Sequence, residues 1–88
     1  MSEHHILVID DDERLRVLLR RFLEESGFRV TDASNASEAR KILAGIAFDL
    51  LVVDIMMPGE DGISLCRHLV ETRRHASRHV LRHRIAKE

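Results

Sequence analysis

Two apolar runs that each end in aspartate constrain the fold of this chain more than any other feature. The runs are residues 6–9 and residues 50–53, and they are followed by three aspartates at 10–12 and by Asp54. Continuous branched apolar residues are typical of strands that are buried on both faces of a parallel sheet. We therefore expect two parallel strands whose carboxyl ends carry acidic side chains.

Helical and extended patterns alternate between these two runs. Residues 12–26 carry an apolar stripe at spacings of three and four, which predicts an amphipathic helix that ends at Gly27. Residues 28–31 alternate as a short strand. The stripe expected to face the core consists of Leu15, Leu18, Leu19, Phe22 and Leu23.

The rest of the chain adds a second and a third helix. Ser34 or Asn35 is suited to cap the second helix, and the third is expected to begin near Ile63. No Gly or Pro follows before the chain end, so this third helix is expected to be long. Three successive strand–helix units predict an α/β fold with a parallel sheet and right-handed crossovers.

Composition changes abruptly near residue 73. Residues 73–88 hold six Arg or Lys and one Glu, a net charge of +5, whereas residues 1–72 carry a net charge of −6. This change predicts a partial domain over residues 1–72 and a basic, helical extension over residues 73–88. The extension lacks aromatic residues, so we do not expect it to bind nucleic acid directly. Its histidines His75, His79 and His83 would share one helix face, which is either solvated or a site for Zn²⁺ or Ni²⁺.

Several classes of protein are excluded by composition. No apolar run approaches the roughly 20 residues that a membrane-spanning helix needs. Residues 1–5 do not resemble a secretory signal, so we expect a cytoplasmic protein. Cys66 is the single cysteine, which excludes an intrachain disulfide and a cysteine-based zinc site.

The aspartates are expected to meet at one edge of the sheet, because ligands of open parallel sheets bind beyond the carboxyl ends of the strands. Carboxylates this close repel each other unless a cation neutralises them, and oxygen ligands favour Mg²⁺. Such a site leaves coordination positions for phosphate oxygens, and one carboxylate could accept a phosphoryl group. The alternative is a purely structural role, in which aspartates at the start of a helix serve only as helix caps.

Five segments resemble the receiver domains of bacterial two-component response regulators in order and spacing. They are residues 6–12, 27–30, 38–39, 48–50 and 54–62, and the last has the specific pattern D-x-M-M-P-G-x-D-G. The resemblance covers about residues 5–72 and implies a flavodoxin-like receiver fold.

The resemblance also implies the roles of individual residues. Asp54 would be the phosphoacceptor, charged by a histidine kinase. Asp10, Asp11 and Asp54 would bind Mg²⁺ together with the backbone carbonyl of Met56, and Asp12 would be a helix cap. The chain would act as a phosphoacceptor in a phosphorelay and not as an enzyme.

The resemblance is incomplete, because a receiver has two further strands that this sequence does not display. We therefore expect a truncated fold in which residues 50–53 form an exposed sheet edge. Such an edge, or the long third helix, would support a homodimer or larger assembly.

Two other functions remain open. A degenerate receiver could act as a self-associating interaction module without being phosphorylated. A small Mg²⁺-dependent phosphatase also uses an aspartate after a strand, although the turn after Asp54 does not favour it. Phosphorylation of Asp54 distinguishes a phosphoacceptor from an interaction module, and turnover of an aryl phosphate would indicate a phosphatase.

Overall fold

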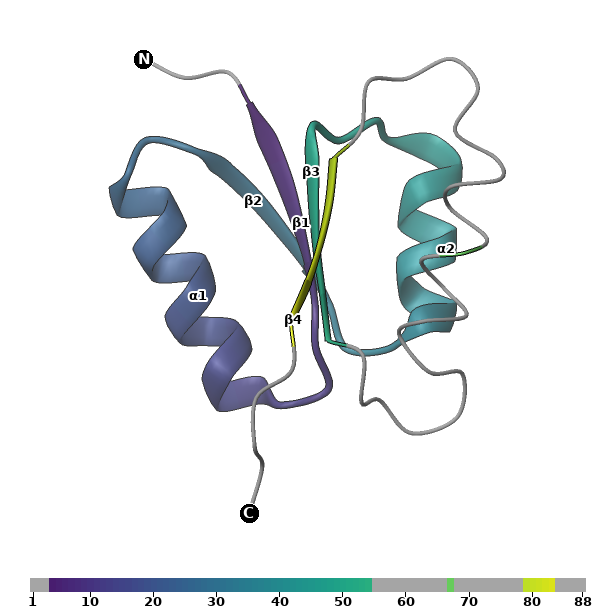
Figure 1. Cartoon of the computed structure of the whole chain (residues 1–88), viewed down its shortest axis with the longest axis horizontal. Helices are drawn as coiled ribbons and strands as arrows, with labels where there is room; N and C mark the ends of the chain where they lie inside the picture. Colours follow the sequence, from purple (N-terminus) through teal and green to yellow (C-terminus); the bar gives the residue numbers. More distant parts are fainter. Residues whose placement is uncertain (1–3, 55–66, 68–78, 84–88) are drawn as a thin grey trace.

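The computed structural model describes residues 4–54, Arg67 and residues 79–83. In these residues the strands form one parallel sheet in the order β2-β1-β3-β4, with a helix on each side (Figure 1). This confirms the predicted α/β fold with a parallel sheet. The elements are β1 (His5–Ile9), α1 (Glu13–Glu25), β2 (Arg29–Ala33), α2 (Ala36–Gly45), β3 (Leu50–Asp54) and β4 (His79–His83).

The core has two layers because successive strand residues point to opposite faces of the sheet. From β1, Leu7 and Ile9 pack in the cluster on the α2 side, whereas Ile6 and Val8 pack in the cluster on the α1 side. All four are buried. The continuous apolar run thus reflects a strand covered on both faces, as predicted.

The helix boundaries follow from local hydrogen bonds. Asp12 caps α1 by accepting from the Leu15 backbone N–H at 3.2 Å, and Asn35 caps α2 by accepting from the Glu38 N–H at 2.7 Å. Gly27 follows α1 with a φ of 99°, a conformation that favours glycine. Neither described helix is both long and apolar enough to cross a membrane.

The apolar stripe of α1 is narrower than expected. Leu19 and Leu23 pack against the sheet, but Leu18 and Phe22 are exposed. At 100° per residue, Leu18 and Phe22 lie on one flank of the stripe, whereas Leu19 and Leu23 lie nearer to the side that faces the sheet. The inward orientation expected for Leu18 and Phe22 is therefore wrong.

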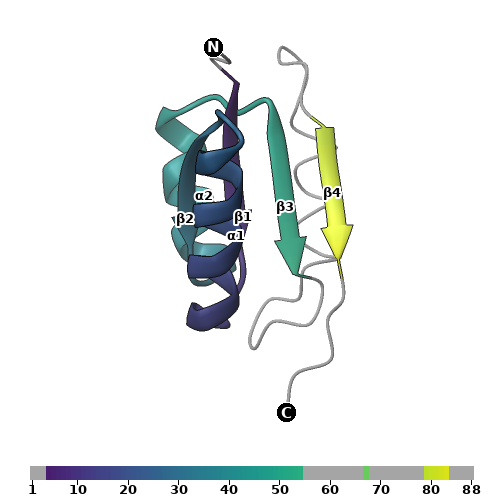
Figure 2. The ribbon, with the colours of Figure 1, turned by 90° about the vertical axis from the view of Figure 1, so that its left-hand side faces the viewer.

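Residues 79–83 form a strand and not the expected helix. β4 lies beside β3 and parallel to it, in a register that runs from Leu50 opposite His79 to Asp54 opposite His83 (Figure 2). The sequence concealed this strand, because Val80 and Leu81 are the only adjacent apolar residues within residues 73–84, which are rich in Arg and His. Unpaired backbone groups along β3 favour an extended partner and override this weak local preference.

Because residues 79–83 form a strand, two further expectations are also wrong. β3 is paired with β1 and with β4, so residues 50–53 are not an exposed edge and do not support a strand-mediated homodimer. His79 and His83 lie at opposite ends of a strand, about 13 Å apart at 3.3 Å per residue, too far to share a metal ion. Of the expected third helix only Arg67 is described, and it is helical; the rest, with the assembly through it, lies outside the described residues.

His5, at the amino end of β1, is linked to β2 and to the residues just before β3. Its Nε2 lies 2.7 Å from the Thr31 hydroxyl, its ring lies 4.4 Å from that of Phe48, and its backbone N–H donates to Asp49. Burial and the nearby Arg29 charge lower the pKa of His5 from 6.5, and Asp49 opposes this shift. The folded state therefore favours the neutral imidazole.

This shift predicts that acidification destabilises the protein through His5. Below pH 6.5 the unfolded state binds more protons at this residue than the folded state, so the free energy of unfolding falls as the pH falls. Urea unfolding at about pH 7.5 and 5.5 should show a smaller loss in His5→Gln than in the wild type. Equal losses in the two proteins would contradict the prediction.

Candidate phosphoacceptor and metal site

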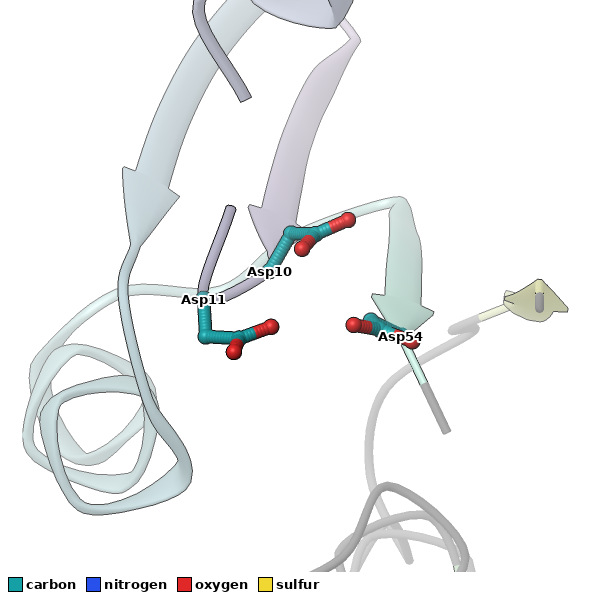
Figure 3. Close-up of side chains that lie close together, drawn as sticks. All are labelled: Asp10, Asp11 and Asp54. Carbon is teal, nitrogen blue, oxygen red and sulfur yellow. The ribbon is translucent and has the colours of Figure 1, made fainter. Parts of the chain in front are cut away.

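Three aspartates meet at the carboxyl edge of the sheet. β1 and β3 are adjacent and Ile9 lies opposite Val53, so Asp10 and Asp54 occupy neighbouring positions just beyond this pair. Asp11 follows in the loop, and the three side chains face a common space (Figure 3). One carboxylate oxygen from each residue lies within 4.8 Å of the others.

Burial increases the electrostatic repulsion among the carboxylates of this cluster. Asp10 and Asp54 have no exposed surface, whereas Asp11 is exposed. Buried carboxylates that face each other repel strongly, because little solvent screens them. A bound cation would relieve this repulsion.

The donor set fits Mg²⁺. All three ligands are carboxylate oxygens, which hard divalent cations prefer, and opposite oxygens of an octahedral Mg²⁺ lie about 4.2 Å apart. The 4.8 Å span of the cluster exceeds this value by about 0.6 Å. Small side-chain movements would therefore allow coordination.

The loop after β1 is fixed by backbone contacts that orient Asp10. Its N–H donates to the Ala33 carbonyl at 3.1 Å, and its Oδ1 accepts from the Asp12 N–H at 2.9 Å. Asp12 itself caps α1 and is not part of the acidic cluster. The expected helix cap at Asp12 is thus confirmed, whereas the binding of Mg²⁺ by Asp10 and Asp11 stays a prediction.

Arg16 connects this loop to α1 and β2, a role that the sequence did not reveal. Its Nη1 donates to the Asp10 carbonyl at 2.9 Å, and its Nε donates to Asp32 at 3.0 Å. The Arg16 side chain is only 14% exposed. In the sequence, Arg16 lies off the apolar stripe of the helix, and no motif marks its distant partner. Arg16 thus positions the backbone that carries Asp10.

Replacing Arg16 should therefore weaken the metal site. In Arg16→Gln we expect a loss of about tenfold in Mg²⁺ affinity, the lower end of what loss of a supporting contact costs. Calorimetric titration with Mg²⁺ measures this loss. Arg20→Gln is the matched control, because Arg20 reaches the same Asp32 at 3.4 Å but is half exposed and bears no contact to Asp10. Unchanged Mg²⁺ affinity in Arg16→Gln would exclude the positioning role.

The structure brings together Asp10, Asp11 and Asp54, three of the four residues predicted to bind Mg²⁺. The fourth, Met56, lies outside the described residues, as does the rest of the turn at 55–62. Its carbonyl therefore stays a predicted ligand.

The comparisons with known proteins agree with this geometry. The family model described as "Response regulator receiver domain" matches residues 6–83. The match includes β4, so the expectation that the family pattern ends near residue 72 is wrong. Residues 79–83 belong both to the sheet and to the matched domain.

Two named relatives are similar to more than three quarters of this chain. The chain is 54% identical over 68 residues to Protein PetR of Rhodobacter capsulatus, covering 77% of this chain and 29% of that protein. It is 44% identical over 72 residues to the transcriptional regulatory protein ResD of Bacillus subtilis, covering 80% and 29%. The chain thus spans less than a third of the length of these relatives.

A solved structure shows the same fold. The response regulator protein TrrA of Thermotoga maritima, described as a complex with Mg(2+)-BeF, is 34% identical with a TM-score of 0.77. The similarity covers 80% of this chain and 61% of that one. The sheet order β2-β1-β3-β4 is also the beginning of the flavodoxin-like order. The chain therefore belongs to the family of response regulator receiver domains.

Proposed function

We propose that this chain is a phosphoacceptor that takes a phosphoryl group from a histidine kinase onto Asp54 with the help of Mg²⁺. The observation that carries the proposal is the cluster in which oxygens of Asp10, Asp11 and Asp54 lie within 4.8 Å of one another. Membership of the receiver family supports it. A cytoplasmic location, where such a kinase would present its phosphohistidine, belongs to the same proposal.

The metal would be held by carboxylate oxygens of Asp10, Asp11 and Asp54, with the Met56 carbonyl as a further predicted ligand. When bound, Mg²⁺ supplies positive charge that offsets the negative charge of the transferring phosphoryl group. The TrrA structure supports this assignment, because that receiver was solved with Mg(2+)-BeF.

Asp54 supplies the nucleophile. One of its carboxylate oxygens forms a bond to phosphorus while the bond from phosphorus to the imidazole nitrogen of phosphohistidine breaks, and the nitrogen keeps the electron pair. The product is an acyl phosphate on Asp54 and a free histidine on the kinase. Each chain accepts one group, so it acts as a stoichiometric acceptor and not as an enzyme with turnover.

The remaining residues of the site orient and enclose the acceptor. β3 is paired on both sides and holds the Asp54 backbone rigidly at the sheet edge. Arg16 and the Ala33 carbonyl fix the backbone of Asp10. Asp11 is the exposed member of the cluster, so we infer that the phosphodonor approaches from its side.

The test is the intact mass of the protein after incubation with a small acyl phosphate. We expect one added phosphoryl group in the presence of Mg²⁺ and none with a chelator, because the acidic cluster opposes the approach of an anionic donor. An unchanged mass with Mg²⁺ would contradict the proposal and favour an interaction module. Continuous hydrolysis of an aryl phosphate would favour a phosphatase instead.

A further inference from the structure

The carboxyl end of β2 supports the acidic cluster from outside it. The Asp10 N–H donates to the Ala33 carbonyl at 3.1 Å. Asp32, the preceding residue, accepts from Arg16 Nε at 3.0 Å and is not one of the three residues of the cluster. Two consecutive residues of β2 thus support the loop after β1, Ala33 by a direct hydrogen bond and Asp32 through Arg16.

Arg16 holds the peptide group that joins Asp10 to Asp11. Its Nη1 donates at 2.9 Å to the Asp10 carbonyl, which belongs to this peptide group. The carboxylates on the two sides of the peptide group differ in burial, since Asp10 is buried and Asp11 is exposed. A rotation of the peptide plane would move both of them relative to Asp54. The contact therefore controls the geometry of the cluster without being part of it.

Asp32 determines where Nη1 of Arg16 lies. The guanidinium group is planar and rigid, so an ion pair at Nε fixes the direction in which the other nitrogens donate. The side chains of Arg16 and Asp32 are 14% and 25% exposed, so solvent screens this pair only in part. Arg20 reaches the other carboxylate oxygen of Asp32, Oδ1, at 3.4 Å. Oδ2 of Asp32 is thus the oxygen that orients Arg16.

A rigid cluster discriminates between divalent cations of equal charge. Mg²⁺ requires nearly ideal octahedral geometry with ligands at about 2.1 Å, whereas Ca²⁺ accepts variable geometry at about 2.3–2.6 Å. Loosening a loop that carries two ligands therefore weakens the binding of Mg²⁺ more than that of Ca²⁺. A change in net charge, in contrast, affects both ions alike.

We propose that Asp32 is a positioning residue that makes the acidic cluster selective for Mg²⁺ over Ca²⁺, and that it acts through Arg16. The inference rests on the proposed function, because it takes Asp10, Asp11 and Asp54 as the metal ligands. It goes beyond that function by assigning the choice of ion to a residue of β2 that lies outside the cluster.

Calorimetric titrations of Asp32→Ala with Mg²⁺ and with Ca²⁺ test this role. We expect the affinity for Mg²⁺ to fall about tenfold, as in Arg16→Gln, and the affinity for Ca²⁺ to fall less than about threefold. The ratio of the two affinities is the decisive quantity, because the loss of one negative charge lowers both affinities alike. Glu24→Ala is the matched control, since Glu24 carries the same charge and pairs with Arg20 at 3.4 Å, and it should keep the ratio of the wild type.

Two further variants show whether Asp32 acts through Arg16. Asp32→Asn retains an oxygen that can accept from Arg16 Nε, so its affinity ratio should lie between those of Asp32→Ala and the wild type. The double variant Arg16→Gln/Asp32→Ala should have a ratio within about twofold of the single variants, because both changes remove the same support. A cooperative urea transition without metal shows that each variant is folded.

Three results would overturn the inference while leaving the proposed function intact. They are a wild type that binds Mg²⁺ but does not prefer it to Ca²⁺, an Asp32→Ala variant with the affinity ratio of the wild type, and a double variant in which the two losses add. A wild type that binds neither ion would contradict the proposed function, and the inference with it.

Discussion

Asp10→Asn is expected to lose at least about 100-fold in Mg²⁺ affinity, because removing a direct ligand costs at least as much as removing a supporting contact. Asp10 and Asp54 are both fully buried and face the same small space. Without metal, the variant should be more stable than the wild type, since it lacks one of two repelling buried charges. Thermal unfolding with and without Mg²⁺ measures both effects.

The two effects have opposite signs, which makes the experiment discriminating. The wild type should be stabilised by Mg²⁺ and Asp10→Asn should not, while their order of stability should reverse in a chelator. Asp12→Asn is the matched control, because Asp12 caps α1 and Asn is an equally good cap. Equal stabilisation of the wild type and Asp10→Asn by Mg²⁺ would show that the acidic cluster does not bind this ion.

Removing residues 79–88 is expected to destabilise the domain by about 3 kcal/mol or more, since several backbone hydrogen bonds of about 1 kcal/mol each are lost. β4 pairs with β3 over five residues, from Leu50 opposite His79 to Asp54 opposite His83. Its loss would leave the apolar β3 as a sheet edge that can recruit another chain. Urea unfolding and sedimentation of the 1–78 chain measure the loss of stability and the association.

The control for this truncation removes only residues 84–88, which leaves β4 in place. We expect this shorter truncation to unfold at nearly the same urea concentration as the whole chain. If the 1–78 chain also matched the whole chain in stability and mass, the pairing of β4 with β3 would not contribute to the fold.

The parts of the fold that the sequence predicted are those determined by strong local patterns. The apolar runs that became β1 and β3 are buried on both faces, so nearly every side chain had to be apolar. The position of Asp10 and Asp54 followed from the geometry of parallel strands, because adjacent carboxyl ends meet at one edge. Fold and acidic cluster were therefore both predictable.

The parts that were missed depend on tertiary context. β4 has a short apolar centre among Arg and His, and it is extended because β3 offers it an unpaired edge. Leu18 and Phe22 fit a helical stripe equally well whether they face a sheet or solvent. The contact from Arg16 to the Asp10 carbonyl depends on how α1 lies against the loop, which spacing along the chain does not encode.

The central claim is that Asp54 carries the phosphoryl group, and the most direct measurement is the mass of the acidic peptides after treatment with an acyl phosphate and Mg²⁺. We expect one added phosphoryl group on the peptide that contains Asp54, and none in Asp54→Asn. Asp49→Asn is the matched control, because Asp49 lies just before the amino end of β3 and binds the His5 backbone, and this variant should be phosphorylated like the wild type. A phosphoryl group that persists in Asp54→Asn, or that maps to another residue, would contradict the account.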